Sequence, residues 1–453
     1  MKNDNQPAIR IKETQIKETI VQLLSNLANP KEFNQYMTRF VEAGQSRFAV
    51  IKVGGAVLEN DLENLCSSLT FLERIGLFPI IVHGAGPQLS KNLNRAGIDS
   101  DFIDGQRITN SQVLKIAKKT FVEQNLKLAN KLQSMGVKTS SISSGVFMAE
   151  QSKQTELGYV GEVTEIELQP INIAIDAGAI PILSPLAETA SGQLLNVNAD
   201  IATNQLAISL NPYKIIFLTN TGGLLDESGE IISSLNLITD YELIMKQDWL
   251  HGGMKLKVQQ IADILSQLPA TSSVSITKPS NLAKELFTHK GSGTLIRKGE
   301  SIMTHNDVET IKVNKLTQLI EKSFDKKLDD DYFEKTIIRK AYITYCYRAA
   351  AVVTELNGVP YLDKFVVAEE AKGEGLGKAL WDKLKKENEI LHWRAKPENA
   401  INHFYFKNSD GCIKTDSWNV FWFGLTDFLE IGQCVEQASK KTPSVLPLTS
   451  KAS

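Results

Sequence analysis

The stretch Phe48-Ala-Val-Ile-Lys-Val-Gly-Gly55 places an apolar run directly before two glycines and a helix-like segment. The same order recurs where Phe78-Pro-Ile-Ile-Val leads into His83-Gly84-Ala85-Gly86. Short apolar runs that end at glycine are typical of strands buried in a parallel sheet. Free backbone N–H groups at the start of the following helix attract phosphate. Each stretch therefore predicts a strand, a phosphate-binding turn and a helix.

Strand-like and helix-like segments go on alternating as far as residue 298. Further apolar runs lie at residues 179–183 and 214–218, and the amphipathic stretch at 110–135 lies between strands. This alternation predicts the α/β class, with a mostly parallel central sheet covered by helices.

The chain of 453 residues is too long for one ordinary core, and its texture changes along its length. We expect a helical N-terminal arm over residues 1–46 and an α/β domain over 47–298. A polar linker at 299–312 then leads to a smaller α+β domain at 313–437. The Ser/Pro/Lys-rich residues 438–453 predict a disordered tail.

The composition narrows the range of partners. The formal net charge of −2 gives no support to a nucleic-acid or acidic-membrane partner. The four cysteines, Cys66, Cys346, Cys412 and Cys434, lack metal-ligand spacing, so we expect reduced thiols and no metal site. No apolar run approaches the roughly 18–20 residues of a membrane span, and the first residues lack an apolar signal core. We therefore expect a cytoplasmic protein.

A second glycine-rich loop, Lys372-Gly373-Glu374-Gly375-Leu376-Gly377, follows the strand-like run at 361–367 and opens a helix-like segment at 376–389. Its N–H groups could wrap a pyrophosphate. Two loops of different design predict two phosphate-bearing ligands, and so two reactions.

The first loop suits phosphoryl transfer, which needs backbone donors and cations over the moving charge. Lys52 supplies a compact positive charge, and Gly54 and Gly55 let the backbone approach a phosphate. Structural glycines would explain this short motif equally well. Two more segments favour the kinase interpretation: Asn196-Val-Asn-Ala-Asp200 precedes a helix, and Gly252-Gly-Met-Lys-Leu-Lys257 brings a cation to a helix start.

This set resembles the amino-acid kinase family, and within it the N-acetylglutamate kinases. The resemblance implies a three-layer sandwich and ATP with Mg²⁺ as co-substrate. It also implies that Lys52 and Lys257 clamp the transferring phosphoryl group while Asp200 holds both lysines. By the same resemblance Arg107 and Asn196 bind N-acetylglutamate.

The family's backbone contacts are carried over in the same way. Gly84 and Ala85 are expected to offer N–H groups to the substrate. Ala85 stands where a glycine is common in the family.

The second loop resembles the coenzyme A pyrophosphate loop of the GCN5-related N-acetyltransferases, with Lys372 where Gln or Arg is usual. The chain as a whole resembles the bifunctional N-acetylglutamate synthase/kinases. That resemblance implies acetyl-CoA as the second co-substrate, with Lys364 and Arg394 holding the carboxylates of glutamate. Asn399 and Tyr405 are expected near the thioester, with Tyr405 protonating the departing thiolate.

Tyr405 also has a structural interpretation, because His403-Phe404-Tyr405-Phe406 has the pattern of a buried aromatic strand. The two interpretations remain open from the sequence.

The resemblance predicts two successive steps of arginine biosynthesis: acetylation of L-glutamate, then ATP-dependent phosphorylation of N-acetyl-L-glutamate. One alternative is a synthase whose kinase-like half only senses arginine, which the presence of Lys52, Asp200 and Lys257 argues against. Another is an acetyltransferase of protein lysines, which the cations Lys364 and Arg394 disfavour.

A regulatory site is also predicted. Glu285, Gly291 and Gly293 lie in a segment that resembles the arginine site of arginine-sensitive kinases, so we expect L-arginine as an inhibitor. The N-terminal arm resembles family segments at oligomer contacts and favours a homotetramer.

Overall fold

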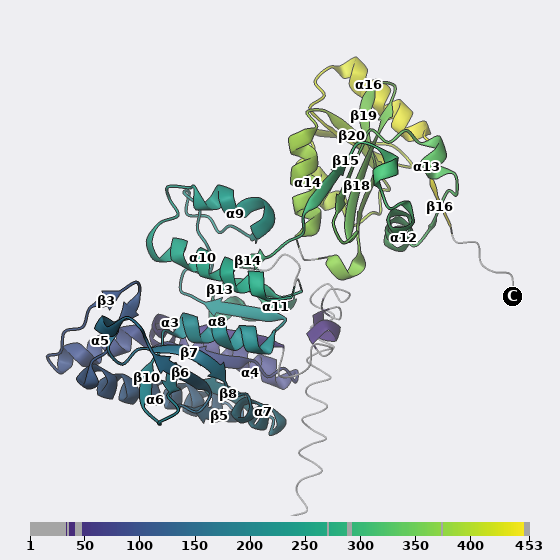
Figure 1. Ribbon diagram of the computed structural model, residues 1–453. Coiled ribbons are helices and arrows are strands. Elements are labelled where there is room, and N and C mark those ends of the chain that lie inside the picture. The colour runs from purple at the N-terminus through teal and green to yellow at the C-terminus, as the bar shows by residue number, and fades with distance from the viewer. Residues whose placement is uncertain are drawn as a thin grey trace, which may run out of the picture. The chain divides into compact units, whose positions relative to one another are not determined.

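The computed structural model describes residues 33, 36–40, 48–269, 271–287, 292–372 and 375–447 (Figure 1). The chain divides into two compact units, Met1–Lys298 and Gly299–Ser453, which are described separately here. Most of the predicted arm lies outside the described residues. The described part of this segment is not a separate arm. Its side chains Phe33, Tyr36 and Phe40 are buried in the core of the first unit. Aromatic side chains at helical spacing found partners there in Phe48 and Phe287.

The first unit is built on an eight-stranded sheet in the order β12-β14-β13-β11-β1-β2-β8-β5. Its pairs are parallel except the antiparallel pair of β13 with β14. The strands are β1 (Ala49–Val53), β2 (Ile80–His83), β5 (Thr139–Ile142), β8 (Ile180–Leu183), β11 (Lys214–Leu218), β12 (Ser234–Asn236), β13 (Ser273–Thr277) and β14 (Thr294–Arg297).

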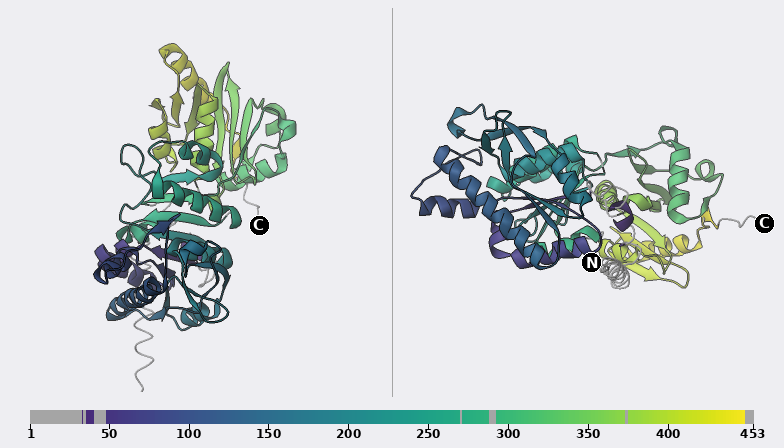
Figure 2. Two further views of the ribbon diagram at one scale, coloured as in Figure 1. Left: turned by 60° about the vertical axis from the view of Figure 1, so that its left-hand side comes forward. Right: turned by 90° about the horizontal axis from the view of Figure 1, so that it is seen from below.

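Helices cover both faces of this sheet (Figures 1 and 2). Ile51 packs with α4 (Leu62–Arg74), α6 (Ser111–Ser134) and α11 (Leu282–Phe287). Its neighbour Val50 points to the other face, where the layer comprises α7 (Gln169–Asp176), α8 (Ala199–Leu210) and α10 (Gly252–Gln267). The predicted three-layer α/β sandwich is confirmed.

Smaller elements complete the unit. A four-stranded sheet has the order β10-β9-β6-β7, and β3 pairs with β4 in a short hairpin. These elements are β3 (Phe102–Ile103), β4 (Gln106–Arg107), β6 (Phe147–Gln151), β7 (Gly161–Ile166), β9 (Leu186–Glu188), β10 (Leu194–Asn196), α3 (Gly55–Asn60), α5 (Gly86–Arg95) and α9 (Leu237–Met245).

The second unit is the predicted smaller α+β fold. Its seven-stranded sheet has the order β15-β17-β18-β19-β20-β22-β21, and β16 pairs with β23. Its strands are β15 (Ile302–His305), β16 (Lys327–Leu328), β17 (Lys340–Thr344), β18 (Ala349–Leu356), β19 (Val359–Val367), β20 (Leu391–Ala395), β21 (Gly411–Lys414), β22 (Asn419–Phe423) and β23 (Val445–Leu446). Its helices are α12 (Val313–Phe324), α13 (Tyr332–Lys335), α14 (Leu376–Glu387), α15 (Asn402–Asn408) and α16 (Phe428–Lys440).

Two predicted irregular segments are ordered elements of this unit. The linker predicted at 299–312 contains β15, which pairs antiparallel with β17. An edge strand needs few apolar residues, which explains its polar sequence. The tail predicted at 438–453 begins inside α16 and continues into β23, so residues 438–447 are not disordered. Polar residues order there because they meet buried charged partners, Asp363 and Lys364.

The aromatic segment at 403–406 is also not a strand. It belongs to α15, where Asn402 donates through Nδ2 to the Lys396 carbonyl at 2.8 Å. Phe404 and Tyr405 both lie against the ring of Trp381. Neighbouring side chains of a strand would point to opposite faces and could not both make this contact.

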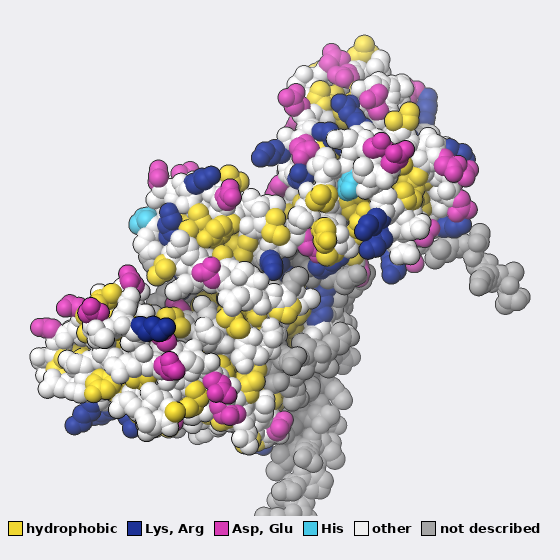
Figure 3. All heavy atoms as spheres, in the orientation of Figure 1, with side chains coloured by type: hydrophobic (Ala, Val, Ile, Leu, Met, Phe, Trp, Pro, Cys, Tyr) yellow, Lys and Arg dark blue, Asp and Glu magenta, His cyan; other side chains and the backbone are white. Residues whose placement is uncertain are grey.

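The surface agrees with the near-neutral composition. Basic and acidic side chains are interspersed over the face shown in Figure 3. No helix among the described residues is long and apolar enough to cross a membrane.

Gly424 gives a test of the second unit. It has φ +74°, and an added Cβ would lie 2.0 Å from the Glu389 carbonyl oxygen. We expect Gly424→Ala to lower the free energy of unfolding by about 3 kcal/mol. Urea unfolding followed by tryptophan fluorescence would measure it, since Trp381, Trp393, Trp418 and Trp422 all lie in this unit.

Gly432→Ala is the matched control. Nothing lies within 4 Å of its added Cβ in α16, so we expect a gain of about 0.5–1 kcal/mol. Equal unfolding midpoints for the two variants would contradict this account.

His83 gives a pH test of the first unit. Burial lowers the pKa of this imidazole, whose Nε2 lies 3.3 Å from Ser184 Oγ, from 6.5 to about 4. The unfolded chain binds this proton first, so stability falls as pH drops from about 6.5 toward 4. Between pH 7.5 and 5.0 the first unit should lose about 2 kcal/mol through this group.

His83→Gln should remove that loss, whereas His251→Gln, at an exposed position, should not. Hydrogen exchange of peptides covering β2 at both pH values would measure the difference. An equal loss in parent and His83→Gln would show that another group causes the pH dependence.

Candidate active sites

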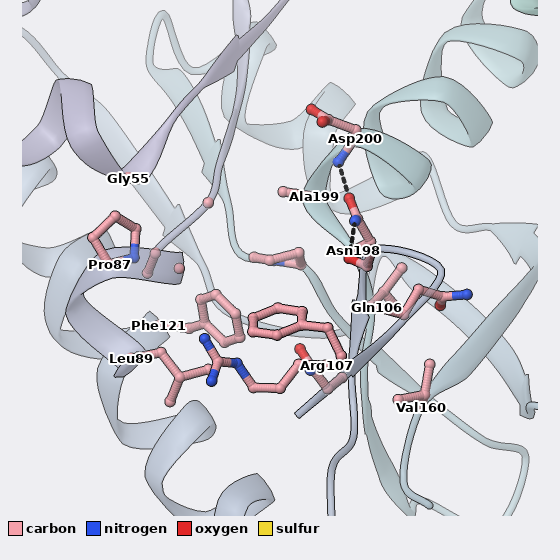
Figure 4. Close-up of a pocket in the computed structure, with 18 of the residues that line it drawn as sticks. Gly55, Pro87, Leu89, Gln106, Arg107, Phe121, Val160, Asn198, Ala199 and Asp200 are labelled. Carbon is pink, nitrogen blue, oxygen red and sulfur yellow. Dashed lines mark hydrogen bonds between the residues drawn. The ribbon is translucent and has the colours of Figure 1, made fainter. Parts of the chain in front are cut away.

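A cavity of about 290 Å³ opens at the carboxyl ends of β1 and β2 (Figure 4). Carboxyl ends of parallel strands are where such sheets bind ligands. Residues predicted from the sequence that line it are Lys52, Gly55, Gly84, Ala85, Arg107, Asn196 and Asp200. The predicted residues Gly54 and Lys257 are not among its lining residues.

The glycine turn after β1 is closely packed. Gly54 precedes α3, and an added Cβ on Gly55 would lie 2.8 Å from Gln88 Oε1 and 2.9 Å from the Pro87 ring. Only glycine fits there without a shift of α5. The Gly84 N–H already donates to the Val53 carbonyl at 2.9 Å. It is therefore an internal contact between strands, which leaves Ala85 of the predicted donor pair.

One cation of the predicted phosphoryl clamp pairs with a carboxylate, and the charge of the other acts on the same carboxylate. Lys52 Nζ lies 2.8 Å from Asp200 Oδ1, joining β1 to the first turn of α8. Burial raises the pKa of Asp200, but the charges of Lys52 and Lys257 outweigh it and hold the pKa below its ordinary value. Burial also lowers the pKa of Lys257, which Asp200 opposes. The three predicted groups thus form one charged cluster.

The other end of the cavity carries a second cation. Figure 4 shows Asp200 at one end and the guanidinium of Arg107 at the other. Arg107 is 8% exposed and donates to the hydroxyls of Ser100 and Ser90 at 2.5 and 2.7 Å. Burial lowers its pKa. No acidic side chain of the described ranges forms a salt bridge with it, so its charge suits a carboxylate ligand.

Asn196 lines the same cavity as Arg107. Its Nδ2 donates to Thr109 Oγ1 at 3.1 Å and fixes the amide at the cavity wall.

The sequence interpretation placed Arg107 of the hairpin β3–β4 at the site but gave no role to Phe102, to Gly105 or to Asn198. Asn198 accepts from the Asp200 N–H at 2.8 Å and donates to the Gly105 carbonyl at 3.3 Å. Phe102 of the hairpin stacks on Arg107, 4.5 Å from the guanidinium carbon to the ring centroid. The Asp104-Gly105 turn signals the hairpin in the sequence, but nothing there indicates that it meets α8.

In the second unit the described part of the predicted coenzyme A loop is a turn that leads into a helix. Gly375 has φ +79° and precedes α14, and Leu376 is buried. An added Cβ on Gly377 would lie 3.4 Å from Val367, so the helix start packs closely on β19. Lys372 pairs with Glu369. Gly373 and Glu374 lie outside the described residues.

Tyr405 sits in an aromatic cluster. It is 5% exposed, and the rings of Trp393, Phe421 and Trp381 lie 5.5, 5.5 and 5.7 Å from its own. Burial raises its pKa far above the ordinary value, so the phenol stays protonated. Asn399 lies on the exposed loop that leads to α15, and its Oδ1 accepts from the Ile401 N–H at 3.2 Å.

The two predicted carboxylate ligands have partners within the protein. Lys364 forms an ion pair with its neighbour Asp363 and donates to Ser444 Oγ at 2.6 Å. Arg394 donates to the Ala438 carbonyl at 2.6 Å. The sequence interpretation missed Asp363, which also accepts from the Tyr332 hydroxyl at 2.7 Å.

The predicted arginine site is partly described. Glu285 is 3% exposed and accepts from the N–H groups of Ser292 and Gly293 at 2.8 and 3.1 Å. It therefore holds the following loop. Gly291 lies outside the described residues.

Residues 47–272 match the model described as the amino acid kinase family, and residues 303–441 match that of the NAT N-acetyltransferase of N-acetylglutamate synthase. An acetylglutamate kinase of Xanthomonas campestris is 49% identical over 93% of this chain and 100% of its own. Human mitochondrial N-acetylglutamate synthase is 33% identical over 91% of this chain and 76% of its own.

A solved N-acetylglutamate synthase of Neisseria gonorrhoeae, complexed with coenzyme A and N-acetyl-glutamate, has a TM-score of 0.59 at 16% identity. It covers 88% of this chain and 100% of its own, and this likeness shows the fold alone. The relatives found by sequence show the family as well as the fold. The chain belongs to the family of acetylglutamate kinases and N-acetylglutamate synthases, enzymes of arginine biosynthesis that join an amino acid kinase domain to an N-acetyltransferase domain.

Proposed function

We propose that this enzyme acetylates L-glutamate with acetyl-CoA and phosphorylates the resulting N-acetyl-L-glutamate with ATP. The observation that carries the second activity is the ion pair of Lys52 and Asp200, with Lys257 acting on the same carboxylate. A domain that only sensed arginine would have no need for a lysine paired with a half-buried carboxylate at the cavity wall, with the charge of a second lysine acting on that carboxylate.

In the kinase step the side-chain carboxylate of N-acetylglutamate attacks the γ-phosphorus of ATP, and the bond to the ADP oxygen breaks. Lys52 and Lys257 neutralise the charge on the moving phosphoryl group. Asp200 keeps these cations close together against their repulsion. Arg107, at the far end of the cavity, pairs with the other carboxylate of the substrate. An ionised carboxylate needs no general base.

Mg²⁺ fits this scheme as a companion of ATP. The described residues contain no group of three or more His, Cys, Asp or Glu side chains that could hold a metal ion. We expect the phosphates themselves to bring it, as is common for this ion.

In the acetyl-transfer step the glutamate amine releases a proton to solvent and attacks the thioester carbonyl, and the carbon–sulfur bond breaks. Tyr405 donates its phenolic proton to the departing thiolate, and the phenoxide then regains a proton from solvent. Burial raises the pKa of Tyr405, so the phenol is protonated before the transfer. The turn before α14 holds the pyrophosphate.

The order of the steps is chemically coherent. Acetylation removes the nucleophilic amine, which would otherwise attack the acyl phosphate. We further propose a homotetramer and inhibition by L-arginine at Glu285 and Gly293. Isothermal titration with L-arginine tests the latter, and no heat at millimolar ligand would refute it.

Single variants should separate the two activities. Lys52→Ala should abolish ATP-dependent hydroxamate formation from N-acetylglutamate while leaving acetyl-CoA consumption with glutamate unchanged. Tyr405→Phe should lower the acetyltransferase kcat by about 100-fold and spare the kinase. Following both products from glutamate, acetyl-CoA and ATP supplied together measures both. A parent enzyme that forms no acyl phosphate would favour the alternative of a synthase with a regulatory kinase-like domain.

Asp200→Asn tests the charge cluster directly. The amide keeps the size of the side chain but leaves Lys52 and Lys257 without their shared anion, so they separate. We expect kinase kcat to fall by about 100-fold or more with acetyltransferase rates unchanged. Asp176→Asn, at the exposed end of α7, is the control. A kinase rate within twofold of the parent would rule out a role for this carboxylate.

A further inference from the structure

The strands β19 and β20 lie side by side but pair at a single position, Tyr361 with His392. Residues that follow one another in a strand point to opposite faces. Trp393 packs on Trp381 of α14, whose start holds the coenzyme A loop. Arg394 therefore points to the other face, and its hydrogen bond to Ala438 places it there beside the end of α16. One face of the sheet at β19 and β20 is therefore the face of α14 and the coenzyme A loop. The opposite face carries the cation Arg394.

Residues 438–446, here called the C-terminal strap, lie across this second face. Arg394 of β20 donates to the carbonyl of Ala438, and Lys364 of β19 donates to Ser444 Oγ. At its far end the strap becomes β23 and pairs with β16. The strap thus connects β19 and β20 through one side-chain hydrogen bond to each strand.

Lys441 brings a further cation to the same place. Its Nζ lies 3.5 Å from Asp363 Oδ1 and 5.8 Å from the centroid of the Tyr361 ring, at the one paired position of β19 and β20. The Lys441 side chain is 24% exposed. It lies at the solvent side of the buried ion pair of Lys364 and Asp363.

The charges here do not balance. Of the described residues whose charges act on the Lys364 ammonium, Asp363 is the one anion, and Lys441 and Arg394 are further cations. Tyr332 adds a neutral hydroxyl that donates to Asp363. Two positive charges are left over in a largely buried region, which is unfavourable unless an anion joins them.

We propose that Lys441 is a specificity-determining residue of the acetyl acceptor, and that with Lys364 and Arg394 it selects a dicarboxylate. The inference rests on the proposed acetylation of glutamate. Two carboxylates match the surplus of two positive charges. Lys441 comes from the strap, so the acceptor site is complete only when the strap is in place.

A simpler role for Lys441 is a clamp that fixes the strap to Asp363. The two roles differ in one respect. A clamp treats every acceptor alike, whereas a specificity residue distinguishes glutamate from glutamine, which has the same size and one carboxylate fewer.

The test compares Lys441→Gln with Lys440→Gln in the full chain. Lys440 is exposed and pairs with Glu436 on the outer side of α16, so it controls for the loss of one strap charge. Initial rates of thiol release are measured with acetyl-CoA and varied glutamate or glutamine. Kinase activity and thermal unfolding report whether each variant is folded.

In Lys441→Gln we expect the KM for glutamate to rise about tenfold with kcat and the KM for acetyl-CoA within about twofold. The preference in kcat/KM for glutamate over glutamine should fall by a similar factor. Lys440→Gln should match the parent. An unchanged preference in Lys441→Gln overturns the proposal, whether or not the overall rate falls.

A parent enzyme that does not acetylate glutamate would refute the proposed function instead. Calorimetric titration with glutamate then decides the inference separately: weaker binding by Lys441→Gln than by Lys440→Gln supports it, and equal binding overturns it.

Discussion

Each unit of this enzyme contains a carboxylate that draws cations together, half-buried in the first unit and buried in the second. In the first unit Asp200 binds Lys52 across the ends of β1 and α8, and in the second Asp363 binds Lys364 beside Lys441. Cations brought this close repel one another, and burial strengthens the repulsion because the surrounding dielectric is low. The carboxylate makes the arrangement stable while leaving an excess of positive charge. That excess is what an anionic substrate meets.

The backbone supplies the precision that these charges need. Lys52 lies in β1, which pairs in parallel with one strand on each side. Asp200 lies in the first turn of a helix that is capped by Asn198. Neither side chain depends on a long loop for its position. In the second unit the equivalent support comes from the strap, which begins in α16 and is held by side-chain contacts and the short pair of β16 with β23.

This difference explains what the sequence could predict. Lys52, Arg107, Asn196 and Asp200 each follow or lie in a short strand next to a turn, so local pattern and family resemblance could pick them out, and they line one cavity. The three-layer fold follows from the same local alternation. The partners of Lys364 and Arg394 could not be found in this way, because Ser444 and Ala438 lie 80 and 44 positions further along the chain. A polar strap without an apolar pattern reads as a disordered tail until its buried partners are known.

The two sites treat the carboxylates of their substrates differently, and the reactions explain why. In acetyl transfer the nucleophile is the amine, so both carboxylates of glutamate are spectators and cations can hold them both. In phosphoryl transfer one carboxylate is itself the nucleophile. A guanidinium paired with it would withdraw the electron density that must attack phosphorus, so in the proposed mechanism one fixed cation, Arg107, holds the other carboxylate at the far end of the cavity (Figure 4). Lys52 lies at the other end, where the proposed mechanism directs its charge to the phosphoryl group instead. The same substrate skeleton thus meets several cations in one unit and a separated pair of charge centres in the other.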